Sequence, residues 1–458
     1  MIFVALLTIL NAVLHNDSVV NEYRVNIAGL PANIFDFMLV IGCGIGLLRS
    51  RRSTTERLHP AILWMMVFFA LALIGGLIGG STNGATTRQV ITMLRNFVAA
   101  PLALYMAYSL TGSFKAGRLY LYASILAGLG VSVMIVLFFR EKATDAVRTE
   151  VTNIRAVAYV ATYAGLAACL LFYTLASNIR LLPIIPSLAC LGVCFVGQFT
   201  TLSRSDWLST VVGLGAAFVM LPKSARASSF ARAVVAVPVL IASLYVGLYA
   251  GSRLTGKDMF TKMHDRVLSM LPGDHPGVKA KAWDTRLPGT FAELRMWASS
   301  PLIGGGFGIQ DTAEMDPMVT GGLRHNTWSS TLCETGILGF TAFAIMVGSM
   351  IVCGWRMNRD QMDQTTVLIG TMGVICGCFF LVYAFATMSF NQVRQGLPLF
   401  VMAGVVLRTR AMQLDAKRQL AEDQAYLDQY AAVEEPFPGE AMPAPMDEPV
   451  FGNWYQPN

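Results

Sequence analysis

Residues 324–339 read Arg324-His325-Asn326-Thr327-Trp328-Ser329-Ser330-Thr331-Leu332-Cys333-Glu334-Thr335-Gly336-Ile337-Leu338-Gly339. A basic and polar cluster stands here directly before a long apolar segment. A segment of about 20 predominantly apolar residues is long enough to cross a bilayer as a helix. The stretch therefore predicts a membrane helix that begins beside an imidazole and a guanidinium, at the surface of the bilayer.

The composition of the whole chain supports this prediction. Hydrophobic residues make up 54% of the 458 residues and charged residues only 14%, whereas roughly a quarter of a soluble protein is charged. We expect an all-α polytopic membrane protein of about twelve spans. They begin near Ile2, Ala28, Ala61, Gln89, Leu119, Ala156, Leu181, Trp207, Ala233, Trp328, Thr365 and Gly396. The eight cysteines form no Cys-x-x-Cys pair, so we expect buried, unbridged thiols.

Basic residues are concentrated in alternate connections between the expected spans. They are Arg49, Arg51, Arg52, Arg57, Lys115, Arg118, Lys223, Arg226, Arg232, Arg356, Arg359, Arg408 and Arg410. Short cytoplasmic loops carry an excess of Lys and Arg, so this pattern predicts that both termini are cytoplasmic. The net charge of +6 therefore reflects topology, and we expect no nucleic-acid partner.

Four parts of the chain follow from these spans. Residues 1–250 are expected to form an N-terminal transmembrane bundle of about nine spans, and residues 328–408 the C-terminal transmembrane helices. Between them, residues 251–327 form a long loop outside the cytoplasm, and Phe291, Leu294 and Trp297 at helical spacing favour a folded cap there. Residues 409–458 are expected to be a largely disordered, acidic and Pro-rich cytoplasmic tail. The tail is a candidate docking site for a partner protein, and a solvated appendage is the simpler interpretation.

Two further polar blocks fall on the extracytoplasmic side. The first is Ser203-Arg204-Ser205-Asp206. An arginine near the hydrocarbon region is costly unless it is paired or has a function. Arg204 is therefore either a functional residue or the partner of Asp206 in a structural salt bridge. The second block pairs Arg286 with a glycine-rich turn at 301–308, which lets the backbone fold closely under the cap. Asp36, an acid inside an expected span, is interpreted as structural. The sequence contains no Walker, Rossmann, His-Glu-x-x-His or Asp-x-Asp motif, so we expect no cofactor and no metal.

The three blocks in this order resemble the signature of bacterial O-antigen ligases and related Wzy-type polysaccharide polymerases. The resemblance implies a GT-C-like glycosyltransferase fold with a long periplasmic loop, in the bacterial inner membrane. It also implies that Arg204 and Arg286 bind the diphosphate of the donor and that His325 accepts a proton. Arg295 competes with Arg286 for the second arginine, because Phe291 stands where the family commonly has a tryptophan. The expected substrate-binding residues are Arg324, Asn326, Arg295 and Glu334.

The function implied by the resemblance is transfer of an undecaprenyl-diphosphate-linked glycan, with inversion and without a metal. An O-antigen ligase would use lipid A-core as the acceptor, and a polymerase would use a growing glycan; the sequence leaves both open, with the ligase preferred. The alternative from a different class is a transporter of the same lipid-linked glycan. A transporter should show polar groups or broken helices near the middle of the membrane in both halves. Here the polar groups cluster on one side of the membrane, which favours the transferase. Membrane lipids are expected to surround the spans.

Overall fold

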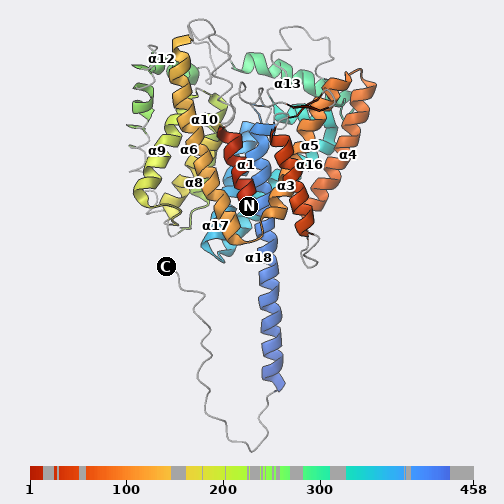
Figure 1. Cartoon of the computed structure of the whole chain (residues 1–458), viewed down its shortest axis with the longest axis vertical. Helices are drawn as coiled ribbons and strands as arrows, with labels where there is room; N and C mark the ends of the chain where they lie inside the picture. The colour runs from red at the N-terminus through yellow and green to blue at the C-terminus, as the bar shows by residue number, and fades with distance from the viewer. Residues whose placement is uncertain are drawn as a thin grey trace, which may run out of the picture. The chain divides into compact units, whose positions relative to one another are not determined.

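The computed structural model describes residues 1–13, 25–27, 30–32, 34–50, 58–145, 161–177, 179–201, 203–223, 226, 238, 241–242, 244–249, 252–253, 258–268, 282–309, 326–385, 387 and 393–433. Helices make up nearly all of this part of the chain (Figure 1). They are α1 (Ile2–Val13), α3 (Ile34–Ser50), α4 (Pro60–Thr82), α5 (Thr87–Leu110), α6 (Phe114–Asp145), α8 (Ala161–Ser177), α9 (Ile184–Thr200), α10 (Arg204–Val219), α12 (Met259–Leu268), α13 (Ala282–Ser299), α16 (Thr327–Asp360), α17 (Gln364–Tyr383) and α18 (Val393–Val433). Arg324, His325 and the tail from 434 to 458 lie outside the described residues.

The helices confirm a multi-pass helical membrane protein. Among the described residues, six helices are long and apolar enough to cross a membrane, and three shorter apolar helices accompany them. The six are Pro60–Thr82, Thr87–Leu110, Phe114–Val136, Thr327–Asp360, Gln364–Tyr383 and Gln395–Gln429. Helical residues 244–249 fall within the span expected after Ala233. The total of twelve spans stays a prediction.

One expected boundary was wrong. A small antiparallel hairpin, β1 (Val25–Ile27) and β2 (Leu30–Ala32), occupies the start expected for the second span, so α3 begins only at Ile34. At the other end of the chain, α18 runs without interruption from the last expected span into the segment after residue 408. No glycine or proline stands between Val405 and Val433, so nothing in that sequence breaks the helix.

Side-chain caps fix where several helices begin. At α5, the Thr86 hydroxyl accepts from the amide of Gln89 (3.3 Å), and the Gln89 side chain accepts from the amide of Thr86 (2.8 Å), which completes a capping box. At α17, a carboxylate oxygen of Asp363 accepts from the amides of Thr365 (2.6 Å) and Thr366 (3.0 Å). These caps satisfy amides that the helix itself leaves without acceptors.

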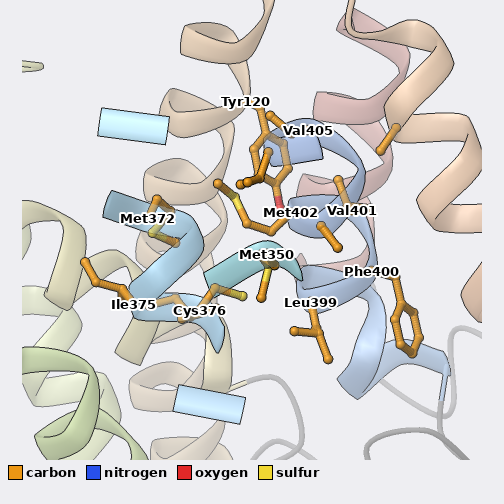
Figure 2. Close-up of a cluster of buried hydrophobic side chains, with 14 of the residues drawn as sticks. Tyr120, Met350, Met372, Ile375, Cys376, Leu399, Phe400, Val401, Met402 and Val405 are labelled. Atoms are coloured by element: carbon orange, nitrogen blue, oxygen red, sulfur yellow. The ribbon is translucent and has the colours of Figure 1, made fainter. Parts of the chain in front are cut away.

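The core lies around α17 and the first part of α18. Helix α17 packs against α16, α10, α6 and α8, and it is apolar on every side, as expected for a helix surrounded by protein. Figure 2 shows the cluster, with Met350 of α16 beside Cys376 of α17, and with Tyr120 of α6 and Met372 and Ile375 of α17 also labelled. The residues labelled from α18 are Leu399, Phe400, Val401, Met402 and Val405. All eight cysteines are free and either buried or half-buried, which confirms the prediction of unbridged thiols.

The helices run between two ends of the bundle, and basic residues gather at one of them. Helix α16 ends beside α18, where Arg410 pairs with Asp360 at 2.5 Å. Arg408 donates to the carbonyl of Thr111 (3.3 Å), just after α5, and the Arg49 guanidinium lies beside Gly112. We call this the basic end. The common position agrees with the prediction that these loops share one side of the membrane.

The opposite end carries the start of α16 at Asn326, and we call it the site end. Helix α9 also begins at the basic end, since the Tyr122 hydroxyl of α6 donates to the carbonyl of Leu181 (3.0 Å). The α9–α10 link, with Arg204, therefore lies at the site end. The chain divides into two compact units, Met1–Ala411 and Met412–Asn458, and both ends belong to the first.

An ion pair joins α3 to α5. The Arg95 guanidinium contacts the Asp36 carboxylate through Nη2 to Oδ2 (2.7 Å) and Nε to Oδ1 (3.0 Å), with both side chains partly buried. This two-point geometry is the strong form of the interaction. It supplies the partner that the sequence required for Asp36, and it confirms a structural role.

Breaking this pair should destabilise the bundle. We expect Asp36→Ala to lower the free energy of unfolding by roughly 1–3 kcal/mol, because it leaves a guanidinium without its counter-charge. Thermal unfolding in one detergent gives the comparison. The double variant Asp36→Ala/Arg95→Met removes both charges and should regain part of the loss. Equal stability of Asp36→Ala and the wild type would show that the pair is energetically neutral.

Candidate functional site

The first turn of α16 is fixed from its own sequence and from α17. Asn326 caps the helix, and its Oδ1 accepts from the amides of Trp328 (3.0 Å) and Ser329 (3.4 Å). The amide of Thr327 donates to the carbonyls of Ala384 (2.7 Å) and Thr387 (3.1 Å), just beyond α17. The residue that precedes Asn326 is His325. The backbone next to His325 is therefore anchored at two points.

A third anchor comes from α13. The Ser329 hydroxyl donates a short hydrogen bond to Oε2 of Glu293. Both side chains are buried, Glu293 with 1% and Ser329 with 2% of its surface exposed. Burial of a carboxylate is costly unless it is hydrogen-bonded or paired. This contact therefore ties the cap helix α13 to the turn that carries the opening motif.

Helix α16 is broken at Gly336, which has a φ of +62°. The glycine-rich turn after α13 satisfies the backbone groups on both sides of the break. The amides of Gly305 and Gly306 donate to the carbonyls of Cys333 (2.7 Å) and Glu334 (3.1 Å), and the Ile337 amide donates to the carbonyl of Pro301 (3.0 Å). Non-helical backbone at membrane depth is tolerated only when protein or water satisfies it in this way.

The same turn lies directly against α4. The amide of Phe307 donates to the carbonyl of Gly76 (2.8 Å), and the Asn83 side chain donates to the carbonyl of Gly305 (2.7 Å). Gly306 has a φ of +95°, and a Cβ on it would lie 1.8 Å from the amide nitrogen of Gly80. Only glycine fits such a contact. The prediction that this turn lets the backbone fold closely under the cap is confirmed.

The Arg204 block begins α10 at the same end. Arg204 is half-buried at the first residue of the helix. Asp206 is buried and hydrogen-bonds through its side chain to Ser203. The Trp207 indole donates to the carbonyl of Gln198 (3.1 Å), which fixes the link between α9 and α10. These contacts therefore fix the backbone at Arg204, where α10 begins.

The structure describes several, but not all, of the expected site residues. Asn326 caps α16, and Glu334 is buried in that helix at the break. Arg286 falls within α13, whose second half exposes the Arg295 side chain. The side-chain position of Arg286, and all of Arg324 and His325, lie outside the described residues. The choice between Arg286 and Arg295 therefore stays open.

Sequence reasoning missed Glu293 and Ser329. The spacing of Phe291, Leu294 and Trp297 indicated a helix but not which side chains it buries: Phe291 is 56% exposed and Glu293 is buried. In a membrane protein, ionisable groups turn toward the protein interior while apolar groups can face lipid.

Comparison with known families covers this part of the chain. Residues 188–344 match the family model described as O-antigen ligase. The matched segment runs from α9 to the middle of α16, and so includes Arg204, α13, the glycine-rich turn and the capped start of α16. A search of curated proteins found no match. The family match agrees with the resemblance seen in the sequence: residues 188–344 are similar to the O-antigen ligase family, and the match supports the O-antigen ligase/Wzy superfamily.

Proposed function

We propose that the chain transfers a glycan from an undecaprenyl-diphosphate-linked donor to an acceptor hydroxyl at the site end of the bundle. The match to this superfamily implies a transferase of the glycan ligase or polymerase type. The observation that carries the proposal is the family match over the elements that build the site end. A GT-C-like fold with twelve spans, and a site end that faces the periplasm, belong to the same proposal.

The proposed chemistry assigns one task to each polar block. Arg204 and Arg286 bind the donor diphosphate, because a guanidinium can hold two phosphate oxygens in one plane. The bond from the anomeric carbon to the diphosphate breaks, and the acceptor oxygen bonds from the opposite face. His325 accepts the proton of the acceptor hydroxyl, since imidazole titrates near neutral pH. The arginines stabilise the charge that grows on the departing diphosphate. The reaction as proposed uses no metal and no cofactor.

A ligase is our preferred assignment, with lipid A-core as the acceptor. The experiment incubates purified protein in proteoliposomes with lipid-linked repeat units, with and without lipid A-core. A new bond to core lipid supports a ligase, and growth of chains on the carrier lipid supports a polymerase. Movement of the donor between leaflets without any new covalent product would contradict both and support the transporter.

The broken helix α16 bears on the transporter alternative. Transporters use broken helices to aim free backbone groups at their substrate. Here the carbonyls of Cys333 and Glu334 accept hydrogen bonds from the glycine-rich turn. The backbone groups at the break therefore bind the turn after α13. This favours a structural role for the break over a role in binding a transported substrate.

The proposed orientation predicts which residues an impermeant thiol reagent can reach. Ser299, exposed at the end of α13, should as Ser299→Cys react from the periplasmic face of intact cells. Gln361, exposed beyond α16 at the basic end, should as Gln361→Cys react only after the inner membrane is opened. The unsubstituted protein measures the background from its own cysteines. The reverse pattern would overturn the proposed orientation and the periplasmic location of the site.

A further inference from the structure

The contact between Glu293 and Ser329 is specific in its position on α16. Asn326 is the N-cap, so Ser329 is the third residue of the helix. This is the position where a glutamate of the same chain segment often completes a capping box. Here the residue is serine, and the carboxylate comes from α13 instead. Glu293 therefore holds this turn from outside the helix, by a hydrogen bond to the Ser329 hydroxyl.

The contact also lies between two parts of the proposed site. Helix α13 contains Arg286 and Arg295, and α16 begins one residue after Asn326, next to His325. The hydrogen bond from Ser329 to Glu293 is a side-chain link between the first turn of α16 and α13. The glycine-rich turn forms a second junction, near the break at Gly336. Loss of the Glu293 contact would therefore leave α13 and the first turn of α16 free to shift relative to each other, while the junction near Gly336 held.

We propose that Glu293 is a positioning residue that acts through Ser329 to set the first turn of α16, which His325 directly precedes in the chain, against the arginine-bearing helix α13. This inference rests on the proposed function. A misplacement of about 1 Å between a catalytic group and its substrate can cost on the order of 10²-fold in rate. Loss of the contact should therefore lower kcat and leave the affinity for the acceptor nearly unchanged.

The test is a double-mutant cycle with Glu293→Ala, Ser329→Ala and the double variant, measured as kcat and KM of glycan transfer per folded protein. We expect each single variant to lower kcat by about 10- to 100-fold, with KM changed less than threefold. The double variant should be no slower than Glu293→Ala, because both changes remove the same link. Glu293→Gln keeps an acceptor oxygen and should restore most of kcat. It also serves where the alanine variant does not fold.

A matched control and a second measurement separate this inference from the proposed function. Ser299→Ala removes an exposed hydroxyl from the same helix and should leave kcat unchanged. Hydrogen exchange needs no substrate, and the amides of 327–330 should lose protection in Glu293→Ala while those of α17 keep theirs. Unchanged kcat and unchanged exchange in Glu293→Ala, or additive losses in the double variant, would overturn the positioning role. A wild-type protein that transfers no glycan would overturn the proposed function instead, whatever the exchange shows.

Discussion

His325→Ala should lower the rate of glycan transfer by about 10²- to 10⁴-fold, the usual contribution of a general base. The side chain follows Arg324 and precedes Asn326, which caps α16 and is held by α17. The variant should insert into the membrane and express as the wild type does, because Asn326 supplies the N-cap of α16. Initial rates with purified, folded protein give the measurement.

The pH dependence separates two roles for His325. A base must be neutral to accept a proton, so activity should fall as the pH drops below the imidazole pKa, ordinarily about 6.5. The fall should be absent from the residual rate of His325→Gln. A residue that only anchors the acceptor would instead raise KM and leave the pH profile nearly unchanged.

His264 is the matched control for this prediction. It lies on α12 with 69% of its side chain exposed, beside Asp265, and His264→Ala should retain wild-type transfer. Wild-type transfer by His325→Ala at both saturating and limiting acceptor would remove His325 from the mechanism and favour the transporter alternative.

Arg204→Ala should cost on the order of 2–4 kcal/mol of transition-state stabilisation, as the loss of an oxyanion donor does. Arg204→Lys should recover only part of the rate, because a point charge cannot replace the planar pair of donors. The measurement is kcat/KM for the lipid-linked donor. Normal turnover in Arg204→Ala would assign Arg204 to a structural role at the start of α10, beside buried Asp206.

The same measurement decides between the two arginines of α13. We expect Arg286→Ala to lose activity to a similar degree as Arg204→Ala, and Arg295→Ala, on the exposed side of the helix, to lose less. The opposite order would move the second diphosphate contact to Arg295.

The membrane helices could be predicted from the sequence because bilayer thickness imposes a length of apolar chain that needs no knowledge of packing. Helices α4 and α17 begin within one residue of the starts expected at Ala61 and Thr365. The hairpin before α3 escaped prediction because it is short and four of its six strand residues are Val25, Ile27, Leu30 and Ala32, which continue the apolar pattern of the span. Hydropathy alone does not separate an extended segment from a helical one over so few residues.

The candidate site was predictable only as a set of motifs. The order of Arg204, Arg286 and His325 along the chain indicated the family, and the family match bears this out. The partners that hold these segments are distant in sequence, as with Arg95 for Asp36 and Glu293 for Ser329. Such pairs follow from how helices pack, and no local pattern in the chain encodes them.

The central claim is that the chain breaks the bond between a glycan and its lipid diphosphate and passes the glycan to a hydroxyl. The most direct measurement is the release of free undecaprenyl diphosphate when purified protein meets the lipid-linked donor and an acceptor, without any nucleotide. The account predicts release in equal molar amount to the glycan transferred, and little release from His325→Ala. Wild-type protein that binds the donor but releases no undecaprenyl diphosphate, with lipid A-core or with a second lipid-linked glycan as acceptor, would contradict the account.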